Sequence, residues 1–447
     1  MQLFTIQKIV GLLLMIFSAT MLPPIVIDAI VAEGAWFPFA ATFFFTFLCG
    51  TIVWYPARES RDELSIRDGF MVVVLFWTVL SLFGALPFIF SSEVTLSLAG
   101  AVFESISGLT TTGATVITHI DGLPKAILYY RQQLQWLGGM GIIVLAVAIL
   151  PMLGIGGMQL YRAETPGPVK DSRLTPRITE TAKALWYIYL GLTLLCTLFY
   201  WLAGMTPFDA LGHSFSTVAI GGFSTHDASM GYYQDQPFIE VVAIIFMLLS
   251  GINFALHFVA FHGNSSSPLG YLKSIVSGRG ISIAHYFRDE ELNTYLIVLG
   301  VVAIITSTLL YTTNYFSSVG DALLHGVFQA VSIGTTTGFT TSDYAHWPSF
   351  LPVMLLFASF IGGCAGSTGG GMKVIRFLLL IKQGRREIVR LIHPNAVIPI
   401  KLGGRRVSWK VIDAVWGFFA TYVALFALML LALMLTGLDQ VSALSAT

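Results

Sequence analysis

Charge is scarce in this sequence. Asp, Glu, Lys and Arg make up 11% of the 447 residues, whereas hydrophobic residues make up 55%. Soluble domains usually contain about 25% charged residues. Because so few charges cannot cover a soluble surface, the composition excludes an ordinary cytosolic globular protein and predicts a polytopic membrane protein. The 24 basic residues balance the 24 acidic residues, so no excess of charge indicates nucleic acid as a partner.

Cysteine is also rare. Cys49, Cys196 and Cys364 lie in separate apolar stretches, without the paired spacing of a disulfide framework or a zinc site. The nine histidines form no H-E-x-x-H or comparable ligand pair, and no Ser/His/Asp or Cys/His arrangement indicates nucleophilic catalysis. We therefore expect neither an enzyme nor a covalently bound cofactor.

Long uncharged runs, by contrast, are abundant. A helix needs about 20 mainly apolar residues to cross the hydrocarbon core of a membrane. Nine runs of that order are predicted to span it: 9–27, 35–57, 69–92, 132–161, 184–208, 241–260, 292–320, 344–372 and 414–438. Pro23 and Pro24 are predicted to kink the first of these helices. The first run lacks a small-residue cleavage site, so it is expected to be retained as a span.

Basic residues predict the orientation. Of the 24 Lys and Arg residues, 22 fall at the N-terminus or in alternate loops, and only Lys125 and Arg131 fall in the opposite loops. Basic loops stay on the cytoplasmic side, so the N-terminus is predicted to be cytoplasmic. The richest basic stretch covers residues 373–410.

Three of the opposite loops repeat one pattern of threonine and glycine. They cover residues 107–115, 216–225 and 332–341, and we call them the first, second and third Thr/Gly loops. Their matching glycines are Gly113, Gly222 and Gly338. Each loop follows a segment too short to cross the membrane, at residues 96–106, 208–215 or 322–331. The repeating unit is therefore predicted to be a span, a half-helix, a Thr/Gly loop and a second span.

The residue types in these loops indicate a cation pathway. Irregular backbone at membrane depth is tolerated only where it is buried in protein or lines a water-filled cavity. Rings of carbonyl and hydroxyl oxygens replace the hydration shell of an alkali cation, and the C-terminal end of each half-helix favours positive charge. The second loop has Ile220 and Gly221 where the others have threonine, so it is expected to contribute backbone oxygens only.

A glycine-rich segment, residues 361–373, interrupts the eighth hydrophobic run. Its glycines are Gly362, Gly363, Gly366, Gly369, Gly370 and Gly371. The phosphate-loop pattern G-x-x-x-x-G-K-[ST] fails because Met372 and Val374 stand at the wrong positions. Two interpretations stay open: a flexible segment beneath the third loop, or close helix packing through small residues.

One residue has two open interpretations, and two other functions of the whole chain are alternatives to the cation pathway. Glu104, on the first half-helix, is either an outer cation site or a surface acid. A secondary transporter of another class would need inverted repeats, whereas these units share one orientation. A membrane-embedded enzyme would need acids or histidines clustered at one depth, and the sequence shows no such cluster.

Taken together, these stretches resemble the TrkH family, the membrane subunit of Trk-type bacterial potassium-uptake systems in the Trk/Ktr/HKT superfamily. The likeness covers nearly the whole chain and is most specific at residues 107–115, 135–150, 157–164, 213–228, 360–376 and 393–397. It implies an all-α polytopic membrane protein of potassium-channel-like membrane–pore–membrane units around a central pore, preceded by an extra helix pair. The implied divisions are 1–69 (helix pair and loop), 70–162, 163–262 and 263–383 (three pore units), 384–410 (basic cytosolic loop) and 411–447 (incomplete fourth unit).

The resemblance also implies function, site and partners. K+ is the expected transported ion, at a filter of Thr111, Thr112, Gly113, Ile220, Gly221, Gly222, Thr336, Thr337 and Gly338. The six glycines of the glycine-rich segment are expected to gate the pore. A homodimer in the bacterial inner membrane is expected, docked to a TrkA-like cytosolic regulatory subunit that binds the nucleotide; the basic stretch is either part of the docking face or only a topogenic loop.

The fourth unit departs from this pattern. A repeat of about 110 residues places its filter glycine just beyond Thr447, so the sequence given is expected to lack the fourth filter and the closing span. The alternative function is therefore a non-transporting remnant or a regulatory subunit of the same system.

Overall fold

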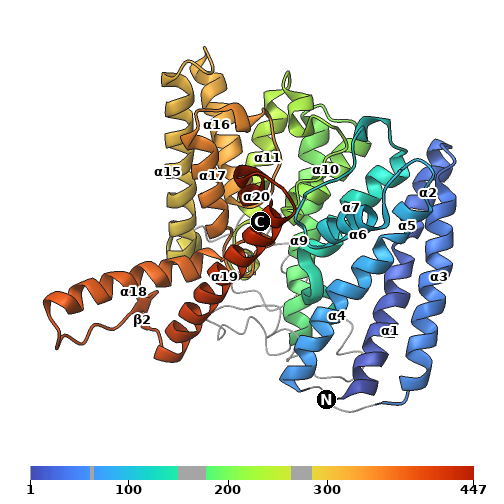
Figure 1. Ribbon diagram of the computed structural model, residues 1–447, viewed down its shortest axis with the longest axis horizontal. Coiled ribbons are helices and arrows are strands. Elements are labelled where there is room, and N and C mark those ends of the chain that lie inside the picture. The colour runs from blue at the N-terminus through green and yellow to red at the C-terminus, as the bar shows by residue number, and fades with distance from the viewer. Residues whose placement is uncertain (1, 61–64, 149–177, 263–283) are drawn as a thin grey trace.

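A computed structural model describes residues 2–60, 65–148, 178–262 and 284–447. Helices make up nearly all of its regular structure, and the described residues add one two-stranded hairpin. Six described helices are long and apolar enough to cross a membrane, and a bent pair makes a seventh. The predicted all-helical membrane fold is therefore present, with the long helices packed side by side (Figure 1).

The N-terminal spans form a tight antiparallel pair. The first span consists of α1 (Leu3–Ala19) and α2 (Leu22–Val31), and the second of α3 (Trp36–Trp54) and the short η1 (Tyr55–Ala57). A Cβ atom placed on Gly11 would lie 2.6 Å from the backbone nitrogen of Trp54, and one on Gly50 would lie 2.9 Å from the carbonyl oxygen of Gly11. Glycine at both positions therefore allows α1 and α3 to approach backbone to backbone.

The next helices form the first repeating unit. They are α4 (Ile66–Gly84), α5 (Leu86–Phe90), the half-helix α6 (Leu98–Leu109), η2 (Ile120–Gly122) and α7 (Lys125–Ala148). The half-helix α6 packs against both α4 and α7. At Gly141 the α7 backbone leaves helical geometry, with φ at 42°.

The second and third units repeat this arrangement. The second contains α9 (Ile178–Leu202), the half-helix α10 (Pro207–Ala219), η4 (Ser229–Tyr233), α11 (Pro237–Ser250) and α12 (Phe254–His262). The third contains α14 (Ala284–Phe287), α15 (Glu290–Thr312), the half-helix α16 (Val319–Gly334), η5 (Tyr344–His346) and α17 (Phe350–Ile361). The second half-helix also packs against α7 of the first unit, and α16 packs against α11 of the second. The half-helices α10 and α16 therefore contact the preceding unit as well as the helices of their own unit.

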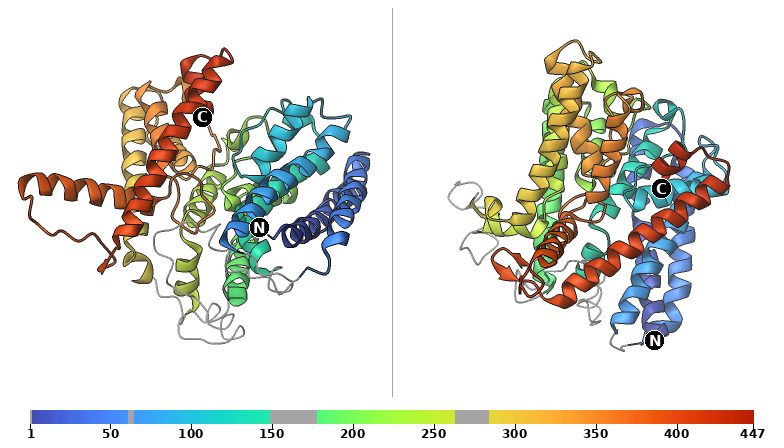
Figure 2. Two further views of the ribbon diagram at one scale, coloured as in Figure 1. Left: turned by 60° about the horizontal axis from the view of Figure 1, so that its bottom comes forward. Right: turned by 60° about the vertical axis from the view of Figure 1, so that its left-hand side comes forward.

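The C-terminal elements leave the body of the molecule. They are α18 (Val374–Ile392), β1 (Lys401–Leu402), β2 (Arg405–Arg406), α19 (Trp409–Leu435) and α20 (Gln440–Ala446). In Figure 1 and in the left-hand view of Figure 2, α18 projects sideways from the packed helices, and α19 returns obliquely toward them.

Two predicted spans differ from the structure. Residues 241–260 form two helices bent by 93° at the break between Ser250 and Phe254, rather than one straight helix. Residues 344–372 contain the short η5 and the 12-residue α17 rather than one long helix, because Gly362 ends α17 at φ 71° and the glycine-rich segment follows. The glycine-rich segment correctly predicted an interruption of the second run, whereas nothing in the hydropathy of residues 241–260 predicted the bend in the first.

Of the other sequence predictions, some concern described residues and some concern residues that the structure does not describe. The half-helices lie at the three predicted places but extend further, to Leu109, Ala219 and Gly334. Residues 149–161, the stretch at 157–164, the unit boundary at 162/163 and the basic residues of 162–177 and 273–279 lie outside the described residues; the boundary at 262/263 lies at the edge of one gap. The stretch 384–410, predicted as a loop, contains the second half of α18 and the hairpin.

Candidate functional site

Each half-helix begins with a capping side chain and ends in a Thr/Gly loop. Ser97, Thr206 and Ser318 accept hydrogen bonds from backbone N–H groups of the first turns of α6, α10 and α16. These caps satisfy donors that a helix start leaves unpaired. The caps mark the N-terminal ends of the three half-helices. Their C-terminal ends, with partially negative carbonyl groups, therefore face the loops.

The three Thr/Gly loops share one backbone conformation. The non-glycine residues Thr111, Ile220 and Thr336 have φ angles of 56°, 55° and 72°. Two positions later Gly113, Gly222 and Gly338 have φ angles of 79°, 79° and 89°. Left-handed conformations are uncommon for threonine and isoleucine, and they are strained. The same conformation at matching positions in three units extends the repeat from sequence to backbone.

One backbone hydrogen bond recurs in each loop. The N–H groups of Thr112, Gly221 and Thr337 donate to carbonyl groups of the preceding half-helix at 2.9, 2.8 and 2.7 Å. The acceptors are the carbonyl oxygens of Ser107, Ser216 and Ser332. This bond folds each chain back beneath its own half-helix.

The loops lie directly against one another. A Cβ atom on Gly113 would lie 2.1 Å from the carbonyl oxygen of Gly221, and one on Gly222 would lie 2.0 Å from that of Thr337. The second loop therefore lies between the first and the third, and glycine is required where a neighbouring carbonyl approaches. The structure brings together the loops that carry all nine predicted filter residues.

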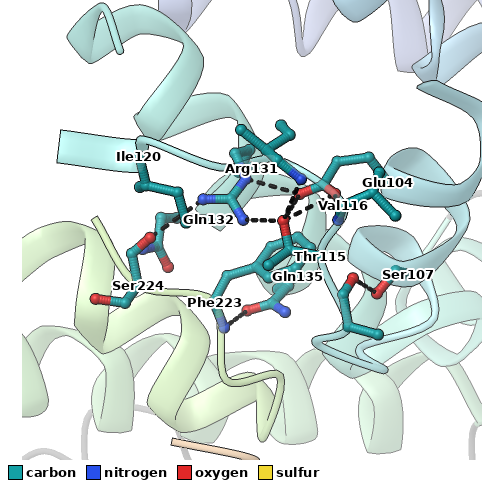
Figure 3. A network of polar contacts seen from close by, with 12 residues as sticks. Glu104, Ser107, Thr115, Val116, Ile120, Arg131, Gln132, Gln135, Phe223 and Ser224 are labelled. Carbon is teal, nitrogen blue, oxygen red and sulfur yellow. Dashed lines mark hydrogen bonds and ion pairs between the residues drawn. The ribbon is translucent and has the colours of Figure 1, made fainter. Parts of the chain in front are cut away.

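A buried ion pair supports the first loop from behind. Arg131 Nε donates to Glu104 Oε1 at 2.9 Å, and both side chains are at most 1% exposed. Thr115 Oγ1 and the backbone N–H of Val116 also donate to the Glu104 carboxylate (Figure 3). Arg131 Nη1 reaches across to the carbonyl oxygen of Ser224 at 3.2 Å. Both earlier interpretations of Glu104 were wrong: it is neither at the surface nor open to an outer cation, since Arg131 occupies its carboxylate.

The glycine-rich segment lies beneath the loops of the second and third units. The N–H of Gly370 donates to Thr336 Oγ1 at 2.7 Å, and Thr368 Oγ1 donates to the carbonyl oxygen of Val218 at 2.9 Å. Gly362, Gly366 and Gly371 have φ angles between 71° and 74°. The segment is therefore an ordered loop in contact with a predicted filter residue, and glycine there serves backbone geometry rather than helix packing.

The bend of the second unit holds the other side of this segment. The N–H of Cys364 donates to the carbonyl oxygen of Gly251 at 2.9 Å, and the N–H of Phe254 donates to that of Gly366 at 3.0 Å. Glu291 Oε1 accepts from the N–H groups of Ala365 and Ile375. Sequence reasoning missed this acid, because its partners lie 74 and 84 residues away.

Charged groups join the outer parts of the first and second units. His226 Nδ1 lies 2.6 Å from Asp121 Oδ1, and His226 Nε2 lies 3.7 Å from Asp209 Oδ1. Burial alone lowers the pKa of His226, but the nearby carboxylates of Asp209 and Asp121, the second of which is hydrogen-bonded to the ring, raise it above its ordinary value. Burial acts to raise the pKa of Asp121, but hydrogen bonds from His226 and Asp227 lower it.

Polar residues of α7 were also missed as site residues. Arg131, Gln132 and Gln135 all lie within it and contact the second unit, and Gln132 accepts a short hydrogen bond from Ser216 Oγ. Their signal was visible in the sequence, since polar side chains inside an otherwise apolar run are costly in a membrane and usually functional. In the described residues, no group of three His, Cys, Asp or Glu side chains is placed to hold a metal ion.

Comparison with known proteins decides the family. A family model described as "TrkH: Cation transport protein" matches residues 36–447. The chain belongs to the TrkH family. Among curated TrkH-family relatives, the Trk system potassium uptake protein TrkH of Vibrio parahaemolyticus is 56% identical over 446 residues, which cover 100% of this chain and 89% of that protein. Its Escherichia coli counterpart is 54% identical, covering 98% of this chain and 87% of that protein.

A solved structure extends the likeness to three dimensions. The crystal structure of the potassium transporter TrkH from Vibrio parahaemolyticus matches with a TM-score of 0.87 and 53% identity, covering 100% of this chain and 88% of that one. The Trk system potassium uptake protein TrkG of Escherichia coli is more distant, at 42% identity. The TrkH-family resemblance and the all-α polytopic fold are thereby confirmed.

Proposed function

We propose that this chain takes up potassium across a bacterial inner membrane, through a filter formed by its Thr/Gly loops. The observation that carries the proposal is the common backbone of three adjoining loops at the ends of three half-helices. The proposed ligands are the backbone carbonyl and threonine hydroxyl oxygens of Thr111, Thr112, Gly113, Ile220, Gly221, Gly222, Thr336, Thr337 and Gly338. Relatives named as potassium uptake proteins support K+ as the ion.

The electrostatics of the loops favour a cation over an anion. The three loop sequences contain no Lys or Arg. The basic side chain behind the first loop, Arg131, is buried and paired with Glu104. Oxygen-lined loops at the C-terminal ends of helices attract positive charge, whereas an anion pathway would need helix N-termini or basic side chains there.

We assign the glycine-rich segment a gating role within this function. Its hydrogen bonds to Thr336 Oγ1 and to the carbonyl oxygen of Val218 support this, because they connect the segment to the third loop and to the second half-helix. Withdrawal of the segment from the third loop and the second half-helix would break these hydrogen bonds.

We further propose a cytoplasmic N-terminus, a homodimer, and control by a cytosolic nucleotide-binding subunit of the TrkA type, with the nucleotide on that partner. The distribution of basic residues supports the orientation. The basic face of α18 and the adjoining hairpin supports a docking role for this region, because both project from the helical body (Figure 1).

Uptake in cells that lack their own potassium transporters tests the proposal. Expression of the chain with its regulatory subunit is expected to restore growth and K+ uptake at low external K+. Gly222→Ala is expected to lower the uptake rate by about tenfold or more, because its Cβ would lie 2.0 Å from the Thr337 carbonyl oxygen at a strained φ of 79°.

Gly122→Ala is the matched control. It is also a glycine of the outer loops, but a Cβ there meets no described atom within 4 Å, so wild-type uptake is expected. No K+ uptake by the wild-type chain, at normal abundance in the membrane, would contradict the proposed function.

A further inference from the structure

The second Thr/Gly loop lacks the side chains that brace the other two. In the first loop the hydroxyl groups of Thr110 and Thr112 are 2.8 Å apart. In the third loop those of Thr335 and Thr337 are 2.7 Å apart. By the repeat, the matching residues of the second loop are Ala219 and Gly221, which have no hydroxyl groups. A loop in the same conformation therefore needs another means of support.

A glutamine of the first unit fills the space next to Gly221, where the other two loops have a threonine side chain. A Cβ atom on Gly221 would lie 2.4 Å from Cδ of Gln135 and 2.5 Å from its Oε1. The Gln135 carboxamide therefore fills the space in which a threonine side chain at position 221 would begin. It is fully buried and comes from α7, 86 residues earlier in the chain.

Both polar atoms of this carboxamide bind the second loop. Gln135 Nε2 donates to the carbonyl oxygen of Gly221 at 2.6 Å. Gln135 Oε1 accepts from the N–H of Phe223 at 3.0 Å, as Figure 3 shows. These two bonds hold the residues on either side of Gly222. They also fix the amide orientation, because a flipped amide would face a donor with a donor and an acceptor with an acceptor.

The serine contacts differ between the units in the same way. Ser107 Oγ donates to the carbonyl oxygen of Ala114, and Ser332 Oγ donates to that of Phe339 at 2.7 Å. The matching Ser216 instead donates to Gln132 Oε1, also on α7. In the first and third units the serine side chain of the half-helix binds its own loop, whereas in the second unit it binds α7.

We propose that Gln135 is a positioning residue that sets the ion preference of the filter. The inference rests on the proposed function. The Gly221 carbonyl oxygen that Gln135 holds also lies at the contact with Gly113, where the first and second loops meet. A carbonyl oxygen has two lone pairs, so it accepts from Gln135 and keeps one for a cation. Gln135 thereby fixes the distance between oxygens of adjacent loops, on which discrimination between K+ and Na+ depends.

Substitutions of Gln135 test this role, with two measurements on the full chain. The first is the melting temperature of the purified protein titrated with K+ or Na+, and the second is uptake of each ion in cells. For Gln135→Ala, the K+/Na+ preference is expected to fall by about tenfold, the effect of losing about 1.4 kcal/mol of differential stabilisation. Gln135→Glu is expected to be at least as damaging, because an ionised carboxylate cannot donate to the Gly221 carbonyl.

A control and a rescue separate positioning from general damage. Gln133→Ala removes a buried glutamine from the same helix, but its Nε2 donates to the carbonyl oxygen of Thr20, outside the three loops, so the wild-type preference is expected. Gly221→Thr alone is expected to disrupt the loop by overlapping Gln135. In the Gln135→Ala background the same threonine has space, and the double variant is expected to regain preference relative to Gln135→Ala.

Each outcome decides between the inference and the proposed function. A wild-type K+/Na+ preference in Gln135→Ala overturns the role of Gln135 and leaves the function standing. Wild-type protein that is stabilised selectively by K+ but takes up none contradicts uptake, while the thermal titrations still test Gln135. No K+ preference of the wild type in either measurement overturns both.

Discussion

At the scale of single residues, His226 connects two outer loops by its charge. Its ring lies between carboxylates of both units, Asp121 from the first and Asp209 from the second, and it stacks on Tyr232 at 3.6 Å. Because its folded pKa is raised, the protonated form is stabilised in the folded protein. This contribution is fully present below the unfolded pKa of about 6.5 and is lost as the pH rises through the folded value.

The melting temperature of the purified protein is expected to show this loss. Between pH 6 and pH 8 the wild type is expected to lose more thermal stability than His226→Gln, which cannot change charge. The lowered pKa of Asp121 acts in a lower window: its contribution holds above its unfolded pKa of about 3.9 and falls only as the pH drops through the folded value. His346→Gln is the matched control, since His346 is 79% exposed and pairs only with Asp343, three residues away. Equal pH slopes for His226→Gln and the wild type would refute the role of His226.

The predictable residues were those that the backbone itself requires. Gly113, Gly222 and Gly338 were found from sequence because a left-handed turn favours glycine, and the repeat shows this turn three times. At Gly113 and Gly222 a neighbouring carbonyl oxygen also approaches closely. Arg131 and Gln135 were not found as supports. Their partners in the second loop lie 93 and 86 residues away, and no local sequence pattern indicates which loop a side chain will contact.

At the scale of elements, the bend between α11 and α12 was harder to predict than the end of α17, where the glycine-rich segment already indicated an interruption of the run. Composition extended a span through residues 344–372, whereas the helix ends at Ile361 and the segment after it folds under the loops. Hydropathy averages over such a break, because glycine and alanine count as apolar whatever backbone they adopt. The positions of the half-helices were predicted correctly because the Thr/Gly loops that follow them recur at regular spacing.

Gly371→Ala is expected to weaken the closed arrangement of the glycine-rich segment. Its φ is 74°, and a Cβ there would lie 2.8 Å from the carbonyl oxygen of Ser359. We expect a faster maximal rate of K+ uptake, with the K+/Na+ preference unchanged, because these contacts lie away from the loop oxygens. Uptake kinetics at a series of K+ and Na+ concentrations measure both quantities.

The matched control is Gly384→Ala on α18, where a Cβ meets no described atom within 4 Å and the backbone is helical. It is expected to retain wild-type kinetics. An altered K+/Na+ preference in Gly371→Ala would argue against a purely gating role of the segment.

At the scale of the whole molecule, the proposed homodimer gives a direct prediction. One chain has a mass of 48.7 kDa, so native mass spectrometry after release from detergent is expected to show a species of twice that mass. Surface features in keeping with association are the projecting α18 and the outward apolar residues of α19, among them Leu425 and Leu428. A single-chain mass at all protein concentrations would contradict the homodimer.

The contacts of the glycine-rich segment also set an order of assembly. Thr368 bonds to Val218 across 150 residues of chain, and Cys364 bonds to Gly251 across more than a hundred. During synthesis the second unit emerges long before residue 368. The carbonyl acceptors in its bend and half-helix therefore lack the hydrogen bonds from the segment until that part of the chain has been made. Contacts of such long range form late in folding. The segment to which we assign the gating role is therefore among the last parts of the chain to reach its folded position, after the loops that it contacts.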